Sequence, residues 1–334
     1  MGRVTIKDVA RYAGLSVSTT SRVLNERAMT SPEARRKVQE AMAALGFHAN
    51  SHARSLRLDR TGTLGVLVSD IRNPFFADIV HGAEQAALQS GMTTIICNAN
   101  ESTSQQSLYL DLLLTQRVDG IIVAPQGDGG QAFIGARNFG MPFVFVDRTI
   151  ADVQVPSVTS DNRSGILSAV SHLVGLHHRR IGYVAGPQET STGRERYEAF
   201  QEALAEHHLT EDRDLVYWGN FQMASGREGA EFLMGLANPP TAIIAADSLM
   251  TLGVVSVCRE RGVKIGKELS LIGYDDVPAF SLITPPLTVI AHDPEKMGTE
   301  AFNMMRALLN GNDVESVVLP SFLLVRESTG PCRG

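Results

Sequence analysis

Seven short, almost continuous apolar runs constrain the fold of this chain more than any other feature. From residue 63 onward they read TLGVLVSD, MTTIICNA, GIIVAP, PFVFVD, RIGYVAG, TAIIAAD and LSLIGYD. Runs that are apolar on both faces are typical of parallel strands buried on both sides. Stretches with a helical pattern, such as residues 77–90 and 294–310, lie between and after them. Repeated strand–helix units predict doubly wound parallel sheets, and the number of strands predicts two similar lobes.

Charged and aromatic residues stand where these runs end. Residues 70–76 follow the first run, Asp147 and Arg148 end the fourth, and Asp247 and Asp275 end two later runs. Ligands of open α/β sheets bind outside the carboxyl ends of the strands. We therefore expect a ligand cleft at these positions.

The N-terminal residues 4–25 have a different pattern, that of two short helices. Thr5 can cap the first helix, with Asp8 completing a capping box. Gly14 and Leu15 break the helix, and Ser16 can cap a second one. The first helix then has one apolar face, formed by Ile6, Val9, Ala10 and Ala13. This pattern predicts a helix-turn-helix, whose second helix enters the DNA major groove, although short helical hairpins also occur as plain bundle corners.

A third helix should begin at Ser31-Pro32-Glu33 and end at Gly46. Its apolar side would close a small three-helix core with Phe47, through Val38, Ala41, Met42 and Leu45. Val17, Ser18 and Arg22 would project from the first turns of the second helix. Arg22 could pair with a guanine, but a phosphate contact is about as common for such a residue.

Charge is distributed unevenly along the chain. The net charge is −6, yet residues 1–60 hold 11 Lys and Arg against 5 Asp and Glu. A basic N-terminal region on an acidic remainder points to a polyanionic partner for that region alone. The three cysteines are scattered and no apolar run is long enough to span a bilayer. We expect a soluble cytoplasmic protein without structural zinc.

Enzyme motifs are missing from the sequence. No GxGxxG opens a helix, and residues 262–268 (GVKIGKE) are one residue short of a P-loop and lack its Ser or Thr. His177-His178 has no acidic partner at metal-ligand spacing and reads as a solvated helix end. We expect no catalytic residues, no metal and no cofactor.

TIKDVARYAGLS followed by VSTTSRVLN resembles the N-terminal headpiece of the lactose/galactose-repressor family of transcription regulators. ARSLR, at the family's distance from the headpiece, extends the resemblance, which continues to about Arg326. It implies a helix-turn-helix domain over residues 1–48, a hinge over 49–61, and a periplasmic-binding-protein-like body over 62–334. The implied crossovers between the lobes lie near 160–162, 291–293 and 320–322. Thr20 replaces the family's usual apolar residue and should weaken the headpiece core slightly.

The resemblance also assigns residues to two binding surfaces. Those implied to contact DNA are Thr5, Val17, Ser18, Thr19, Arg22, Asn25, Asn50, Ala53 and Leu56, the last as a wedge in the minor groove. Those implied to contact an effector are Phe75, Arg148, Arg196, Phe221, Asp247 and Asp275. Such side chains suit a sugar, because rings stack on its apolar face while Arg and Asp satisfy its hydroxyls. A structural role remains open for each, as a cap, an exposed charge or a core residue. Where the family usually has Asn-Asp, this chain has Asp247-Ser248, so the local hydrogen-bond pattern should differ from that of the family.

The expected function is therefore that of a DNA-binding regulator, most simply a repressor, controlled by a sugar-like effector. The alternatives are a purine-responsive regulator, one that uses a protein corepressor, and a solute-binding receptor. The expected partners are a near-palindromic operator and a second copy of the chain, as a dimer or within a tetramer.

Overall fold

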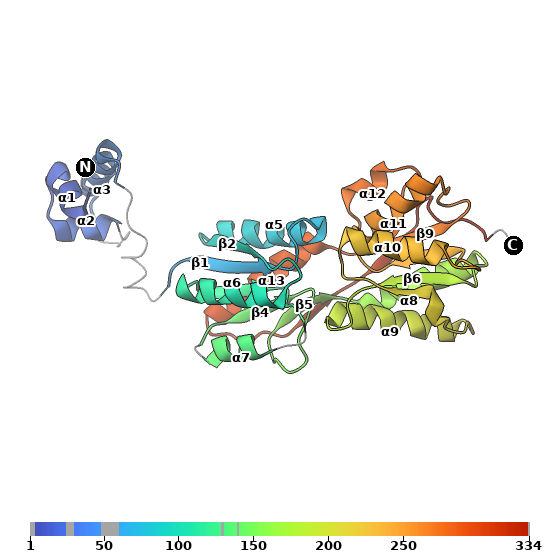
Figure 1. Ribbon diagram of the computed structural model, residues 1–334. Coiled ribbons are helices and arrows are strands. Elements are labelled where there is room, and N and C mark those ends of the chain that lie inside the picture. The colour runs from blue at the N-terminus through green and yellow to red at the C-terminus, as the bar shows by residue number, and fades with distance from the viewer. Residues whose placement is uncertain (1–3, 25–29, 48–59, 128–129, 139, 333–334) are drawn as a thin grey trace. The chain divides into compact units, whose positions relative to one another are not determined.

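The computed structural model describes residues 4–24, 30–47, 60–127, 130–138 and 140–332 (Figure 1). The chain divides into two compact units, residues 1–62 and residues 63–334. No helix within the described ranges is both long and apolar enough to cross a membrane.

The N-terminal unit contains three helices, α1 (Ile6–Ala13), α2 (Val17–Leu24) and α3 (Pro32–Leu45). The Asp8 carboxylate accepts hydrogen bonds from the N–H and the hydroxyl of Thr5, at 3.0 and 2.7 Å. Gly14 ends α1 with a φ of +64°, a conformation that glycine adopts without strain. The buried core consists of Val9, Ala13, Val38 and Ala41, with partly buried Leu15, Val23, Leu24, Met42, Leu45 and Phe47 around it.

Thr20 is fully buried within this unit. Its hydroxyl donates to the backbone oxygen of Ser16 at 3.0 Å. A buried hydroxyl is costly only when it lacks a partner, so this bond removes most of the expected penalty.

The body contains two six-stranded sheets. The first has the order β11 (Val317–Leu319), β5 (Ser157–Ser160), β4 (Phe143–Val146), β3 (Gly120–Val123), β1 (Thr63–Val68) and β2 (Thr93–Asn98). The second has the order β12 (Phe322–Leu324), β10 (Thr288–Ala291), β9 (Ser270–Tyr274), β8 (Ala242–Ala245), β6 (Ile181–Ala185) and β7 (Val216–Trp218). The paired strands are parallel except for β12, which runs antiparallel to β10. The two lobes of parallel strands predicted from the apolar runs are confirmed.

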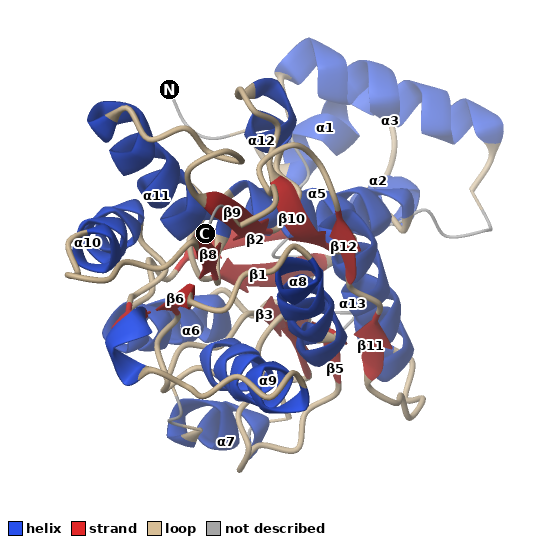
Figure 2. Ribbon diagram, turned by 90° about the vertical axis from the view of Figure 1, so that its right-hand side faces the viewer, coloured by secondary structure: helices blue, strands red, loops and turns tan. Residues whose placement is uncertain are grey.

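Helices cover both faces of each sheet (Figures 1 and 2). In the first lobe α5 (Pro74–Gln89) and α13 (Pro294–Leu309) pack on one face, and α6 (Thr103–Thr115) and α7 (Gln131–Asn138) pack on the other. In the second lobe α10 (Met223–Met234) packs with α11 (Ser248–Arg261), and α8 (Asn162–Gly175) packs with α9 (Ser191–Glu206). A one-turn 3₁₀ helix, η1 (Arg213–Leu215), precedes β7, and the short α12 (Pro278–Leu282) follows β9.

Three connections join the lobes. The chain passes from the first sheet to the second after β5, returns after β10 to form α13 and β11, and crosses again to β12. Gly298 brings α13 close to α5, because a Cβ at this position would lie 2.0 Å from the backbone oxygen of Ile79. This topology places the carboxyl ends of strands from both sheets next to the connections.

Candidate functional site

The start of α2 is an exposed polar surface. Val17 is 44% exposed, and Ser18 and Arg22 are also exposed. The Ser16 hydroxyl accepts from the N–H of Thr19 at 3.1 Å and lies 2.9 Å from the hydroxyl of Ser18. Arg22 forms no ion pair with the residues that the structure describes. This surface therefore offers hydroxyls, a methyl group and a guanidinium, which are the groups that read base edges.

The remaining candidates for DNA contact fall into two groups. Thr5 is exposed at the start of α1, and Thr19 is partly exposed on α2. Four candidates lie outside the described residues, namely Asn25, Asn50, Ala53 and Leu56.

All six candidate effector residues lie in one cluster inside the body. Phe75, Arg148, Arg196, Phe221, Asp247 and Asp275 line a cavity together with Asn73, Phe76, Asp147 and Thr192. The six candidates come from the start of α5, from the loops after β4, β7, β8 and β9, and from α9, so both lobes contribute. The cavity volume is about 10 Å³, which is near the minimum for one water molecule. The cluster is thus closed and tightly packed.

Backbone conformation is unusual at three of these positions. Asp147, Phe221 and Asp275 have φ values of +64°, +61° and +65°. Such values are uncommon for residues other than glycine and cost about 1–3 kcal/mol each when the residue is strained. Strained residues concentrate at binding sites, where the surrounding contacts hold a side chain in a required direction.

Arg148 is buried with its charge compensated. Its guanidinium donates two hydrogen bonds to Glu101, at 2.7 and 2.9 Å, and one to Gln126 Oε1 at 3.0 Å. It also lies 5.0 Å from the centre of the Phe221 ring, which belongs to the other lobe. Its Nε has no hydrogen-bond partner among the described atoms, so this N–H is a donor that a ligand can use.

Arg196 is also buried, so it is not the exposed helix charge that the sequence left open. It donates to Asn162 Oδ1 at 2.8 Å and to the backbone oxygen of Ala246 at 2.7 Å. Its guanidinium lies 3.7 Å from the centre of the Tyr274 ring and 3.9 Å from Asp147. Burial raises the pKa of Asp147, and the charges of Arg196 and Arg148 offset only part of the increase.

Asp247 and Asp275 differ in their protonation. Asp247 caps α11 by accepting from the N–H of Met250 at 2.8 Å, and it also accepts from Asn73 Nδ2 at 3.0 Å. Burial, with the charge of Asp275, raises the pKa of Asp247 to about 8. Burial also acts to raise the pKa of Asp275, but the neighbouring His292, 3.2 Å away, together with Arg196 and Ser248, outweighs it and leaves this pKa below its ordinary value. One carboxyl is therefore protonated near neutral pH while the other is ionised.

Hydrogen bonds between the lobes close the mouth of the cluster. Arg72 of the first lobe donates to Gln222 Oε1 at 3.0 Å, and Gln222 Nε2 donates to Asp70 at 3.3 Å. Ser248 donates to Asn73 Oδ1 at 2.8 Å, so both residues of the unusual Asp247-Ser248 pair form hydrogen bonds with Asn73 of the other lobe. Sequence reasoning did not assign Glu101, Asn162 or His292 to the site. The available signals were positional, because Glu101 follows the second apolar run and the other two lie in the expected crossovers at 160–162 and 291–293.

One expectation outside the cluster is wrong. His178 is 2% exposed, although the sequence suggested a solvated helix end. Its ring nitrogens lie 2.8 Å from the hydroxyl of Thr241 and 2.9 Å from that of Ser270, so the second lobe encloses it. The described residues contain no group of His, Cys, Asp and Glu that could hold a metal ion.

Comparisons with known proteins agree with this geometry. Residues 5–50 match the bacterial regulatory proteins of the lacI family, and residues 170–329 match the periplasmic binding protein-like domain. The HTH-type transcriptional repressor PurR of Photobacterium profundum is 32% identical over 302 residues, which are 90% of each chain. The HTH-type transcriptional regulator RegA of Clostridium saccharobutylicum is 30% identical and covers 97% of this chain and 99% of its own length.

Two solved structures extend the match to the whole chain. The Lac repressor dimer bound to operator and the anti-inducer ONPF has a TM-score of 0.86 and 30% identity, covering 98% of this chain and all of its own. The CelR–cellobiose complex has a TM-score of 0.74 and 31% identity over the same shares. The chain belongs to the LacI family of bacterial regulatory proteins and is a DNA-binding transcriptional repressor with a ligand-binding body.

Proposed function

We propose that a neutral, sugar-like effector binds between the two lobes and sets the affinity of the N-terminal unit for operator DNA. The observation that carries this proposal is the convergence of three aromatic rings, two guanidiniums and three carboxyls in one buried cluster. The rings of Phe75 and Phe221 can cover the apolar face of a sugar. Hydroxyls both donate and accept, so a polyol can engage the charged groups without leaving one unpaired.

The charge of the cluster disfavours an anionic effector. Asp147, Asp247 and Asp275 surround Arg148 and Arg196, and Glu101 already binds Arg148. A phosphate or carboxylate would lie near the carboxylates of Asp275 and Glu101, where repulsion is strong at low dielectric. Asp247, with its pKa of about 8, carries a proton at neutral pH and can donate it to a hydroxyl oxygen.

Effector entry requires the lobes to separate. Ligand pockets have volumes of about 300–1,000 Å³, whereas this cavity has about 10 Å³. The hydrogen bonds of Arg72 and Asn73 across the mouth must therefore open when the effector binds. The three connections between the lobes are the natural hinge, because among the described residues the backbone passes from one lobe to the other only there.

A purine is the alternative effector, and the relatives named PurR favour it. A flat ring would stack between Phe75 and Phe221 but would engage fewer of the charged groups. The related CelR–cellobiose complex favours a sugar. We retain the sugar because the cluster has more charged groups than a purine can satisfy.

The operator-binding form is proposed to be a homodimer. One three-helix unit reads few base pairs, and two-fold operators mirror the symmetry of the proteins that bind them. The related Lac repressor was solved as a dimer on operator DNA. Val17, Ser18, Thr19 and Arg22 would read bases, while Thr5 would contact the backbone. Operator DNA lies in the bacterial cytoplasm, which is where the protein would act.

The test is calorimetry on the full chain with glucose, ribose and cellobiose, with glucose 6-phosphate, and with adenine and hypoxanthine. A neutral sugar should bind, and Asp275→Asn should weaken it about 10- to 100-fold, as expected for a hydrogen bond to a charged group. Asp276→Asn is the matched control, because Asp276 lies outside the cluster and pairs with Arg326.

Two outcomes would contradict the proposal in different ways. Binding of a purine or of the phosphosugar without any neutral sugar would replace the effector class. Equal sugar affinity in the Asp275→Asn and Asp276→Asn proteins would place the site elsewhere.

A further inference from the structure

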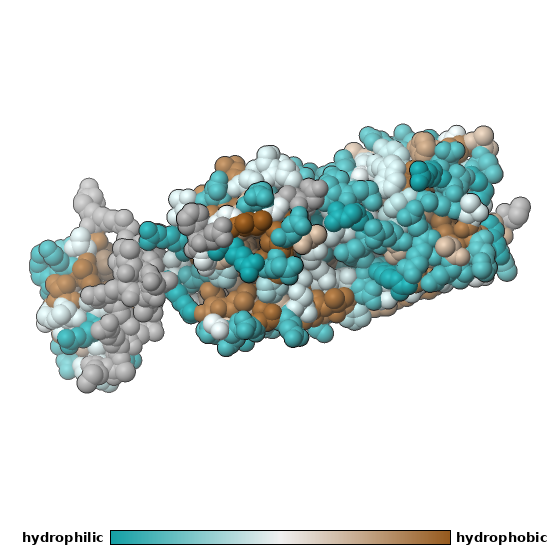
Figure 3. All heavy atoms as spheres, turned by 90° about the horizontal axis from the view of Figure 1, so that it is seen from below, coloured by the Kyte–Doolittle hydropathy of each residue, from teal (hydrophilic) through white to brown (hydrophobic). Residues whose placement is uncertain are grey.

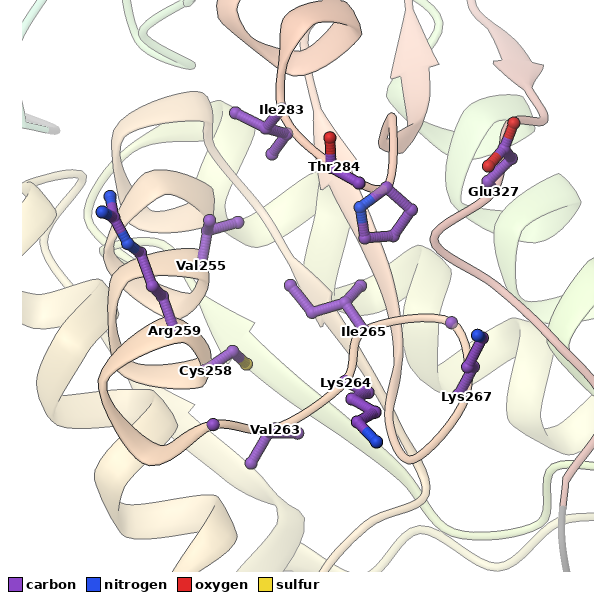
Figure 4. A pocket seen from close by; sticks show the side chains of 13 residues that line it. Val255, Cys258, Arg259, Val263, Lys264, Ile265, Lys267, Ile283, Thr284 and Glu327 are labelled. Atoms are coloured by element: carbon purple, nitrogen blue, oxygen red, sulfur yellow. The ribbon is translucent and has the colours of Figure 1, made fainter.

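A second cavity, far larger than the central cluster, lies in the second lobe. Its volume is about 790 Å³, within the range of small-molecule sites. Figure 4 shows it between α11, the segment 262–267 and the turn at Thr284-Pro285. None of the residues of the central cluster lines it.

The walls of this distal cavity are apolar. Ile265 lies between the α11 side chains and the turn at Thr284-Pro285 (Figure 4), and Val255, Val263 and Ile283 also line it. Cys258 belongs to the same wall, and burial raises the pKa of its thiol to about 11, so it stays neutral. Such walls bind the apolar part of a ligand.

The rim of the distal cavity carries excess positive charge. Arg259, Lys264 and Lys267 line it, against the single carboxylate of Glu327. Arg259 and Lys267 lie on opposite sides of it in Figure 4. All three cations are exposed, and none forms an ion pair with a carboxylate in the part of the chain that the structure describes.

The backbone of this segment cannot hold a phosphate. The amide N–H groups of Val263 and Gly266 donate to backbone oxygens at 2.8 Å, and that of Lys264 donates to Glu268 Oε2 at 3.0 Å. The amides of Lys267 and Glu268 both donate to the oxygen of Lys264. Phosphate loops require several free amides that point at the ligand. An acidic group would therefore be held by side chains.

We propose that the distal cavity binds an amphipathic organic anion, with its apolar body against Ile265 and Ile283 and its acidic group beside Lys264 and Lys267. Apolar walls with a cationic rim match such a ligand in both shape and charge. A neutral sugar would leave the walls uncovered, and an apolar cation would meet three like charges. This site is independent of the effector proposed for the central cluster.

The test is calorimetry on the full chain with acetate, butanoate, octanoate and octylammonium. Octanoate should bind at one site per chain, and affinity should rise with chain length by up to about fourfold per methylene group. Octylammonium, with the same apolar body, should bind at least ~10-fold more weakly. Equal affinity for acetate and octanoate, or for octanoate and octylammonium, would overturn the proposal.

Charge reversal locates the site. Each exposed ion pair contributes up to about a factor of five in affinity. The double variant Lys264→Glu/Lys267→Glu should therefore bind octanoate about 10-fold more weakly and bind octylammonium more tightly. Arg179→Glu/Arg213→Glu is the matched control, since both residues are exposed in the same lobe and neither lines the cavity. An unchanged octanoate affinity in the first variant, or an equal loss in both, would refute the site.

Discussion

Asp247 should make the stability of the body depend on pH in the direction opposite to that of a salt-bridged carboxylate. Its carboxyl is buried at the start of α11 and accepts from the Met250 N–H and from Asn73. Burial raises its pKa to about 8, from an ordinary value of 3.8. Between these values the folded protein keeps the proton that the unfolded chain has lost.

The expected size follows from proton linkage. Where the folded state binds one proton more than the unfolded state, the free energy of unfolding falls by about 1.4 kcal/mol per pH unit as pH rises. Between pH 5.5 and pH 7.0 the raised pKa of Asp247 should therefore lower the free energy of unfolding by about 2 kcal/mol. Asp275 has a lowered pKa, so it stabilises the folded state at neutral pH. This stabilisation is lost only below about pH 4 and does not affect the slope between pH 5.5 and 7.0. Asp147 has a raised pKa and adds a slope of the same sign.

Urea unfolding of the wild-type and Asp247→Asn proteins at several pH values isolates the Asp247 contribution. Trp218 is the single tryptophan of the chain and is 52% exposed at the edge of the second sheet, so its fluorescence reports the body alone. The substitution also changes the hydrogen bond with Asn73, which alters the stability at every pH. The comparison therefore uses the slope of the free energy of unfolding against pH and not its absolute value. The variant should lose about 1.4 kcal/mol per pH unit of the wild-type slope. Identical slopes between pH 5.5 and 7.0 would refute a protonated Asp247.

Three further predictions concern the N-terminal unit. Leu56→Gly, outside the described residues, should reduce operator bending and affinity while leaving the melting temperature of the body unchanged; circular-permutation gel shifts and calorimetry check this, and a parental bend would exclude the wedge. Operator affinity should fall steeply with salt, with a log–log slope of about −0.9 for each phosphate neutralised; a flat dependence in filter binding would contradict a role for the basic region. Thr20→Val keeps the volume and removes the bond to Ser16, so thermal unfolding of the N-terminal unit should change by less than about 1 kcal/mol; a larger loss would mean that the hydroxyl holds α2 in place.

The fold could be predicted where local sequence is sufficient. The seven apolar runs became β1, β2, β3, β4, β6, β8 and β9. Six of them are buried strands, which must be apolar throughout because both faces are covered, whereas β2 is a sheet edge whose residues are mostly exposed or partly buried. Strands β7, β11 and β12 have three residues each and lie at sheet edges, so they leave almost no pattern. β5 reads SVTS, and its burial depends on neighbours that the sequence does not reveal. β10 (TVIA) has an apolar run that the same criterion would have included.

The central cluster was predictable to the same extent. Residues at the ends of parallel strands converge because the topology places those ends together, and this brought Arg148, Asp247 and Asp275 into one group. Their partners were not predictable. Glu101 is 47 residues from Arg148 and Asn162 is 34 residues from Arg196, so no local pattern links either residue to its partner. Which loop reaches a buried charge depends on the packed structure.

The hydrogen bonds between the two lobes bear directly on how a ligand can act. Five hydrogen bonds among the described residues join the lobes around the cluster, and each contributes about 0.5–1.5 kcal/mol. Together they favour the closed arrangement by an amount of the order of 5 kcal/mol. Reversing a two-state equilibrium from 1:99 to 99:1 requires a differential affinity of about 5.5 kcal/mol. A ligand that engages Arg148, Arg196 and the carboxyls only when the lobes separate can supply a difference of this size, so the same contacts that close the cluster make it capable of a switch.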